Sequence, residues 1–452
     1  MPLSLHITII LIFDIYPLQT HKHSQKKSSQ LRNEITFQLL SAEGLGCQAA
    51  FLTWQGDYST AESLYKQSLD VRRKALGDNH YKVASTIAHL GNLALLSYDF
   101  ETASRLIEQS LALRQTAFKG QVNHHAVAAS IYLKARLLQA LGNYKESEKL
   151  FQQSLEMRTA VLGEEHPAVA QSTLGLGQLY TDMRHCREAQ EHFDKVIPML
   201  RKCFHVNNVN IPSASGMGSR VSRVSSVALN HRSEYEVHLA VADNMTKCGL
   251  FLHANVEYLK AEEMIQALLP SSNVTESLQY NILSLKRADL GVSMCQADDA
   301  KKLIGPSGKV LAKMLGSCHS LVADGVVVMA RIMIFDAKYA AAIDLLKRAL
   351  QMYAPVYGRD HPRAAYVHEL LAEASLAPGY HQEAMMHQQL ALEMHVLTCG
   401  SLSAGNFRGG LLLYYSISLF LYFSILVGSC FTWSGALDSS GVLLPYLITS
   451  QA

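Results

Sequence analysis

The chain has 452 residues, with 40 Lys and Arg against 38 Asp and Glu, which leaves a formal net charge of +2. This balance excludes the broad positive field of nucleic-acid-binding proteins, so we expect no nucleic-acid partner. The eight cysteines are scattered without a C-x-x-C pair. That pattern favours buried, free thiols in a reducing compartment over a disulfide framework or a zinc site.

The first segment, residues 1–34, predicts a weakly ordered extension. Its apolar run, Ile7 to Phe13, is too short to cross a bilayer and has no preceding Lys or Arg, which a secretory signal would carry. The segment also lacks a heptad pattern, so we expect no coiled coil there.

From residue 35 onward a pattern recurs. The skeleton L-G-x-x-H-x-x-V-A begins at Leu76, Leu162 and Leu315. Small residues, usually 19 positions before these histidines, serve as anchors of a period near 42 residues. The eight anchors are Ala61, Ala103, Ser147, Ala189, Ala261, Ala300, Ala342 and Ala384. Their spacing is 39 to 44 residues, except for one interval of 72 between Ala189 and Ala261.

The pattern within each unit predicts two antiparallel helices. Apolar residues follow the anchors at gaps of three, four and seven, which is one face of a helix, and Gly163 marks the helix end. His166–Pro167 then places proline in the first turn of the next helix. We expect histidines such as His80 to cap helices rather than bind zinc. Packed helix pairs are about 10 Å apart, whereas zinc needs bonds of about 2 Å.

The long interval predicts an insertion. Residues 204–234 contain Ser, Asn and Gly with little helical periodicity, so we expect a flexible segment between repeats 1–4 (residues 35–203) and repeats 5–8 (residues 235–400). GPSGK at 305–309 lacks the G-x-x-x-x-G-K-[ST] pattern of a phosphate loop. It predicts instead a Gly/Pro break in the helix after Ala300.

The segment 411–431 contains 21 residues and no charge, enough to cross a hydrocarbon core of about 30 Å. Arg408 precedes it and no Lys or Arg follows, which favours a cytoplasmic array anchored by a transmembrane helix, with residues 432–452 as a short tail. Two other interpretations stay open: a buried capping helix, and an intron-derived tail without an evolved role.

The helix pairs, the small residues at fixed positions and the L-G-x-x-H-P-x-V-A links resemble the 42-residue tetratricopeptide repeats of kinesin light chains and nephrocystin-type proteins. The resemblance covers roughly residues 35–400. It implies an all-α fold, an α-solenoid of about eight repeats, with a curved inner wall that binds a segment of another protein.

In kinesin light chains an Asn-Asn pair on this wall contributes to peptide binding, and here the equivalent positions do not hold that pair. The candidate groove residues lie at these positions or three residues further on: His89, Asn92, Tyr132, Arg136, Gln178, Arg331 and Glu373. For Tyr132, packing between units is an equally open interpretation.

The sequence contains no G-x-S-x-G or H-E-x-x-H motif, so we expect no enzyme, no cofactor and no metal site. The leading hypothesis is a non-enzymatic protein-binding scaffold. Two alternatives stay open: a cargo adaptor of the kinesin light chain type, and the remnant of a larger signalling ATPase. The identity of the partner and the oligomeric state are not indicated.

Overall fold

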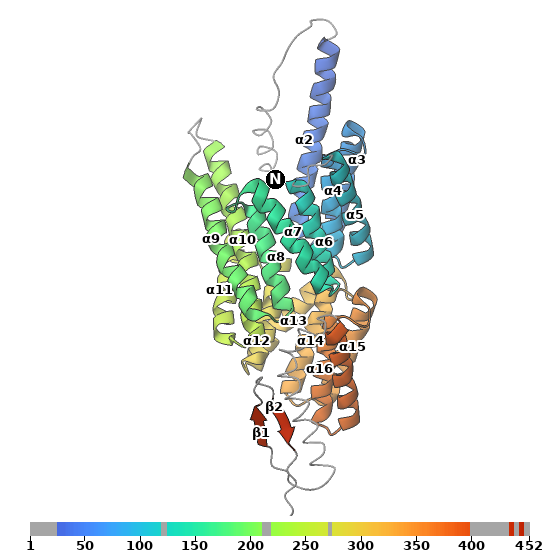
Figure 1. Ribbon diagram of the computed structural model, residues 1–452, viewed down its shortest axis with the longest axis vertical. Helices are drawn as coiled ribbons and strands as arrows, with labels where there is room; N and C mark the ends of the chain where they lie inside the picture. Colours follow the sequence, from blue (N-terminus) through green and yellow to red (C-terminus); the bar gives the residue numbers. More distant parts are fainter. Residues whose placement is uncertain are drawn as a thin grey trace, which may run out of the picture.

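The computed structural model describes residues 25–118, 124–209, 218–269, 274–397, 434–437 and 443–446 (Figure 1). The helices in chain order are α2 (Gln25–Gln55), α3 (Tyr58–Leu76), α4 (Tyr81–Leu96), α5 (Phe100–Ala117), α6 (His125–Ala140), α7 (Tyr144–Leu162), α8 (Pro167–Asp182), α9 (Cys186–Val209), α10 (Gly218–Lys247), α11 (Phe251–Leu268), α12 (Leu278–Ser293), α13 (Ala297–Leu315), α14 (Ser320–Phe335), α15 (Tyr339–Tyr357) and α16 (Pro362–Leu376). A further helix occupies residues 381–397.

These helices pack as consecutive pairs, which we call hairpins one to eight, from α2–α3 to α16 with the helix at 381–397. Within each hairpin the chain turns through one residue with a positive φ. These turn residues are Gly56, Tyr98, Gly142, Arg184, Gly249, Cys295, Ala337 and Gly379. Their spacing is 42 to 46 residues, except for an interval of 65 between Arg184 and Gly249. The all-α solenoid with eight units is therefore confirmed.

One of these turns offers a stability test. Ala337 is exposed and has a φ of 57°, a conformation that costs an L-residue free energy and glycine almost none. We expect Ala337→Gly to raise the free energy of unfolding by about 0.5 kcal/mol or more. Urea denaturation measures the change. The control, Ala341→Gly, is exposed within α15 and should lower stability by up to ~1 kcal/mol.

The small anchor residues lie on the second helix of each hairpin, where they are buried. Ala61 and Ala103 have no exposed surface, and the Ser147 hydroxyl donates to the carbonyl of Ala135 on the preceding helix at 2.8 Å. The fifth anchor needs correction. Ala254, not Ala261, lies three residues after the start of its helix, as the other anchors do. Ala261 is also buried, two helical turns later, which explains the misassignment.

The repeated histidines cap helices, as expected. In each case Nδ1 accepts a hydrogen bond of 3.1 to 3.3 Å from the backbone N–H two residues further on. The capping residues are His80, His124, His166, His319 and His361. An Nδ1 that accepts leaves the ring proton on Nε2, so the cap requires the neutral imidazole.

We call the two helices of each hairpin, in chain order, its first and second helix. The first helices of neighbouring hairpins contact each other from α2 through to α16, whereas neighbouring second helices in the described part contact each other less. The stack of hairpins curves for this reason. The first helices therefore form the inner layer. The curvature brings the turn of an early hairpin against the start of the first helix of the hairpin that follows five places later. Gln279 Nε2 donates to the carbonyl of Trp54 at 3.1 Å, and His361 Nε2 donates to that of Ala140 at 2.9 Å. In Figure 1 the helices α13 to α16 lie below α3 to α8.

Two boundaries differ from the sequence prediction. The sequence predicts a weakly ordered extension over residues 1–34, but α2 begins at Gln25. It predicts a flexible insertion over residues 204–234, but α9 extends to Val209 and α10 begins at Gly218. Helices form in both segments although their local periodicity is weak.

The predicted Gly/Pro break is also wrong. Helix α13 continues through Pro306 to Leu315 without interruption. In the final tail, Ser434–Leu437 (β1) and Leu443–Tyr446 (β2) pair antiparallel, with Ser434 opposite Tyr446. The candidate transmembrane segment, 411–431, lies outside the described residues. No helix in the described ranges is both long and apolar enough to cross a bilayer.

The prediction of buried, free cysteines fails as well. Cys186 and Cys248 form a disulfide bond, although 62 residues separate them in sequence. Of the other cysteines whose side chains the structure describes, Cys47, Cys295 and Cys318 are free but exposed. The pairing depends on the contact between hairpins four and five, which no local pattern reveals.

Candidate partner-binding surface

One position of each first helix, six residues before the turn residue of its hairpin, forms a row along the inner layer. We call these positions the inner register. They are Ala50, Asn92, Arg136, Gln178, Asp243, Asp289, Arg331 and Glu373. Seven of the eight are polar, although first helices otherwise bury small and apolar side chains at most contacts. Five of the seven predicted groove residues belong to this row.

Neighbouring members of the inner register bond to each other across adjacent helices. Arg136 Nη1 donates to Asn92 Oδ1 at 3.0 Å, which joins α6 to α4. Both side chains are half-buried, and Gln178 is half-buried at the equivalent position of α8. The structure therefore brings Asn92 and Arg136 into contact and places Gln178 at the equivalent position of the next first helix.

The second half of the row is dominated by ion pairs. Arg331 on α14 pairs with Asp289 on α12, and its Nη2 donates to Ser293 Oγ at 3.0 Å. Burial disfavours the charge of Arg331, but Asp289 outweighs it and the pKa of the guanidinium is raised. The Arg331 side chain is 18% exposed, so it is largely committed to the fold. Glu373 at the next position, on α16, is exposed.

Sequence reasoning missed Asp243 and Asp289. Asp243 on α10 pairs with Lys286 on α12 and accepts a hydrogen bond of 2.8 Å from the Tyr258 hydroxyl. No complete L-G-x-x-H motif precedes the first helix of either hairpin. The turn Gly249, together with an aromatic start to the second helix, was the signal that could have aligned hairpin five.

His89 and Tyr132 differ sharply in their environments. His89 is exposed and its ring stacks on Tyr65, with centroids 5.6 Å apart. Desolvation by the surrounding protein, followed by the charges of Arg114 and Arg72, lowers the pKa of His89 to about 4. This ring is therefore an accessible, neutral, aromatic group at ordinary pH.

Tyr132, in contrast, belongs to the core. It is 7% exposed, meets Phe151 edge to face at 5.5 Å between centroids, and lies 4.8 Å from the Arg158 guanidinium carbon. Its hydroxyl pKa is raised because burial disfavours the phenolate. Of the two interpretations open for this residue, the structure supports packing between units.

A second set of residues unanticipated by the sequence joins successive hairpins. Arg72, Arg114 and Arg158 occupy equivalent positions of α3, α5 and α7. Arg114 Nη1 donates to the Ala126 carbonyl at 2.7 Å and to Ser130 Oγ at 2.8 Å on the next first helix. These arginines have structural roles, since they satisfy backbone and hydroxyl groups behind the inner register.

The inner register presents polar groups at regular positions along the stack. In the part of the chain that the structure describes, no three His, Cys, Asp or Glu side chains converge as a metal site would require. The inner register instead offers amide, carboxylate and guanidinium groups at a regular interval. Such a row can form hydrogen bonds with an extended backbone or with polar side chains of a partner.

Comparison with known proteins agrees with the hairpin period. Residues 40–116 and 127–202 match a tetratricopeptide repeat family model, and residues 330–363 match a second model of that description. Kinesin light chain-related protein 3 of Arabidopsis thaliana is 22% identical over 323 residues, which cover 58% of this chain and 49% of that protein. The chain thus spans about half the length of this relative.

One solved structure with a TM-score above 0.5 shows a similar fold, and a second match is more distant. A Rap protein complexed with competence and sporulation factor has a TM-score of 0.52 at 11% identity, over 86% of this chain and 99% of that chain. The apo form of the quorum sensor NprR from B. thuringiensis has a TM-score of 0.46 at 12% identity, over 86% and 97% of the two chains. The buried anchors, the capping histidines and the family match identify this chain as a tetratricopeptide repeat protein, with distant similarity to kinesin light chain-related proteins.

Proposed function

We propose that the chain is a non-enzymatic scaffold that binds a segment of another protein along the inner register. The observation that carries the proposal is the row of seven polar side chains, one per first helix, at a single position of the repeat. Asn92, Arg136, Asp243, Asp289 and Arg331 already pair within the fold, whereas Glu373 is exposed at the same position of the repeat. A bound protein segment would form hydrogen bonds with the exposed edges of this row.

The fold neighbour with the higher TM-score supports this use of the architecture. That Rap protein was solved as a complex with competence and sporulation factor. At 11% identity the likeness extends to the fold only, so the residues that select a partner must be those of this chain.

A binding experiment with exposed inner residues tests the proposal. Peptides are selected against the wild-type chain by display, and their affinities are measured by fluorescence anisotropy. We expect the double variant His89→Ala/Glu373→Lys to lose about tenfold or more in affinity, which corresponds to ~1.4 kcal/mol. Both side chains are exposed, so the melting temperature should change little. Arg331 is unsuitable, because Arg331→Glu would place two carboxylates together and destabilise the stack.

The matched control is Arg105→Glu, a charge reversal on the exposed face of α5, a second helix. It should leave the affinities unchanged. If the selected peptides bound the inner double variant as tightly as the wild type, or if Arg105→Glu weakened them equally, the inner layer would not be the binding surface.

A cargo adaptor of the kinesin light chain type is the second candidate, and the similarity to the Arabidopsis protein is what favours it. Co-purification of a kinesin heavy chain with the tagged chain would support this role. Stoichiometric recovery of a peptide partner without any heavy chain would count against it.

We further propose a cytoplasmic location with the uncharged segment 411–431 as a membrane anchor, on the basis of its length and composition. Carbonate extraction of the full chain should leave the protein in the membrane pellet, and deletion of 411–431 should release it. Release of the full chain would rule out the anchor.

A further inference from the structure

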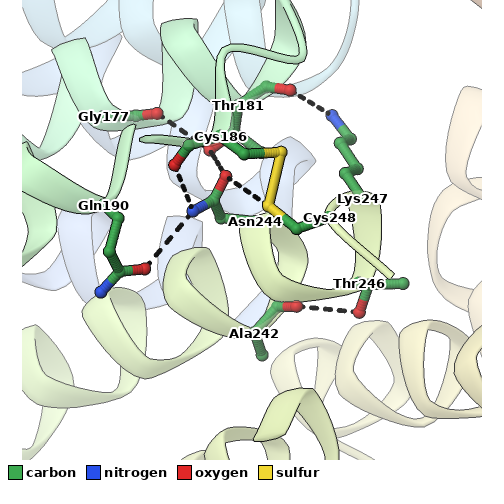
Figure 2. The surroundings of a disulfide bond; sticks show 9 residues. All are labelled: Gly177, Thr181, Cys186, Gln190, Ala242, Asn244, Thr246, Lys247 and Cys248. Atoms are coloured by element: carbon green, nitrogen blue, oxygen red, sulfur yellow. Dashed lines mark hydrogen bonds between the residues drawn. A yellow bond between two sulfur atoms is a disulfide. The ribbon is translucent and has the colours of Figure 1, made fainter. Parts of the chain in front are cut away.

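The disulfide bond joins the turn ends of hairpins four and five. Cys186 is the first residue of α9, and Cys248 immediately follows the last residue of α10, with their Cα atoms 6.1 Å apart (Figure 2). It is the only disulfide among the described residues. The bond therefore clamps one joint of the solenoid and leaves the remaining described joints to packing.

This joint is the one at which the chain departs from its period. The turn residues of hairpins four and five are 65 residues apart, whereas the others are 42 to 46 apart. The additional residues lie mostly in the helices themselves, because α9 and α10 are longer than the helices of the neighbouring hairpins. The covalent bond joins the turn ends of these two longer helices.

Polar contacts hold the two cysteines near each other without the bond. Asn244, which is buried, donates through Nδ2 to the Cys186 carbonyl at 3.2 Å and to Gln190 Oε1 at 3.4 Å (Figure 2). Lys247 Nζ donates to the Thr181 carbonyl at 3.3 Å. These bonds cross from α10 to the end of α8 and the start of α9, so a reduced pair stays positioned to form the disulfide again.

Access also favours reversibility. Cys186 and Cys248 are half-buried, which leaves them within reach of a small thiol. Of the other cysteines whose side chains the structure describes, Cys47, Cys295 and Cys318 are exposed and have no disulfide partner. Small thiols or disulfides in the cell would therefore reduce or oxidise these two cysteines, Cys186 and Cys248, together.

We propose that Cys186 and Cys248 form a reversible redox clip that sets the rigidity of the joint between hairpins four and five. Reduction by a small dithiol begins when its thiolate attacks one sulfur. The Cys186–Cys248 bond breaks, a mixed disulfide forms, and the second thiol of the reagent displaces the protein sulfur. Two electrons and two protons pass to the cysteines, and the reagent becomes a cyclic disulfide. A low-molecular-weight disulfide such as oxidised glutathione reverses the reaction and is reduced to two thiols.

The inner register crosses this joint between Gln178 on α8 and Asp243 on α10. Reduction removes the covalent link between the turn ends and leaves the polar contacts of Asn244 and Lys247, so the joint between the two halves of the row becomes less rigid. The clip is independent of the partner's identity, and its test below needs no partner.

The full chain is equilibrated with oxidised glutathione or with dithiothreitol, quenched in acid, and labelled with a maleimide polymer under denaturing conditions. We expect the oxidised wild type to take up two fewer labels than the reduced protein and to remain monomeric on a non-reducing gel. Its melting temperature should be roughly 3–6 °C higher than in dithiothreitol. Hydrogen exchange near the start of α9 and the end of α10 should accelerate about tenfold on reduction.

The double variant Cys186→Ser/Cys248→Ser should melt like the reduced wild type in both buffers, which shows that it folds. The control Cys318→Ser should keep the full redox response. An equal label count in both buffers, a disulfide-linked dimer, or a melting temperature insensitive to dithiothreitol would overturn the clip.

Discussion

We expect Ala61→Glu to lower the free energy of unfolding by about 4 kcal/mol. Ala61 has no exposed surface and lies in the same cluster as Ala49 of α2, which is also fully buried. Two small side chains allow α2 and α3 to approach closely, and a glutamate there must either carry an unpaired charge into the crossing or force the helices apart. Urea denaturation measures the loss.

The matched control is Ser63→Glu, which adds the same charge two residues away, at an exposed position of α3. It should change stability by less than ~0.5 kcal/mol. The damage should also be local: hydrogen exchange is expected to accelerate in α2 and α3 first, because each hairpin contacts mainly its neighbours. If Ala61→Glu melted like Ser63→Glu, the assignment of Ala61 to a close helix crossing would fail.

The second large effect is a loss of stability on acidification. His361 Nδ1 accepts the helix-capping bond from the Arg363 N–H, and its Nε2 donates to the Ala140 carbonyl. Both bonds together require the neutral ring. Burial is the main cause that lowers the pKa of His361 to about 4, and it outweighs the Ala140 bond and the charges of Asp182 and Asp324.

The sign follows from proton counting. Between the folded pKa near 4 and the ordinary value of about 6.5, the unfolded chain binds the proton that folded His361 excludes, so stability falls as the pH falls through this window. We expect His361 to account for a loss of about 2 kcal/mol between pH 7 and pH 5. Burial also lowers the pKa of His319 to about 4. His319 adds a smaller loss of stability because this residue is partly exposed.

Urea denaturation at pH 7, 6 and 5 tests this with His361→Asn, since asparagine is a helix cap that does not titrate. The variant should be less stable than the wild type at pH 7 but should lose less on acidification. The control, His253→Asn, replaces an exposed histidine on α11 and should keep the wild-type slope. Identical slopes for all three proteins would show that His361 is not a source of the acid lability.

Local patterns were sufficient for the elements of this fold. The period, the paired helices and the capping histidines follow from interactions within a few residues: a small residue at a helix crossing, a glycine at a helix end, an Nδ1 that accepts the N–H two positions on. Ala61 and His80 could therefore be assigned without a structure. Local patterns also placed Asn92, Arg136 and Gln178 at one position of the repeat.

The remaining features depend on contacts between distant parts of the chain. The curvature of the stack decides that His361 meets Ala140, 221 residues earlier, and that hairpins six to eight lie against hairpins one to three. The same packing buries Tyr132, pairs Asp289 with Arg331, and brings Cys186 to Cys248. The sequence alone determined that this protein is a row of helical hairpins. Only the tertiary structure decided which side chains stay available to a partner, because availability depends on how successive hairpins rotate against each other, and small rotations accumulate over the array.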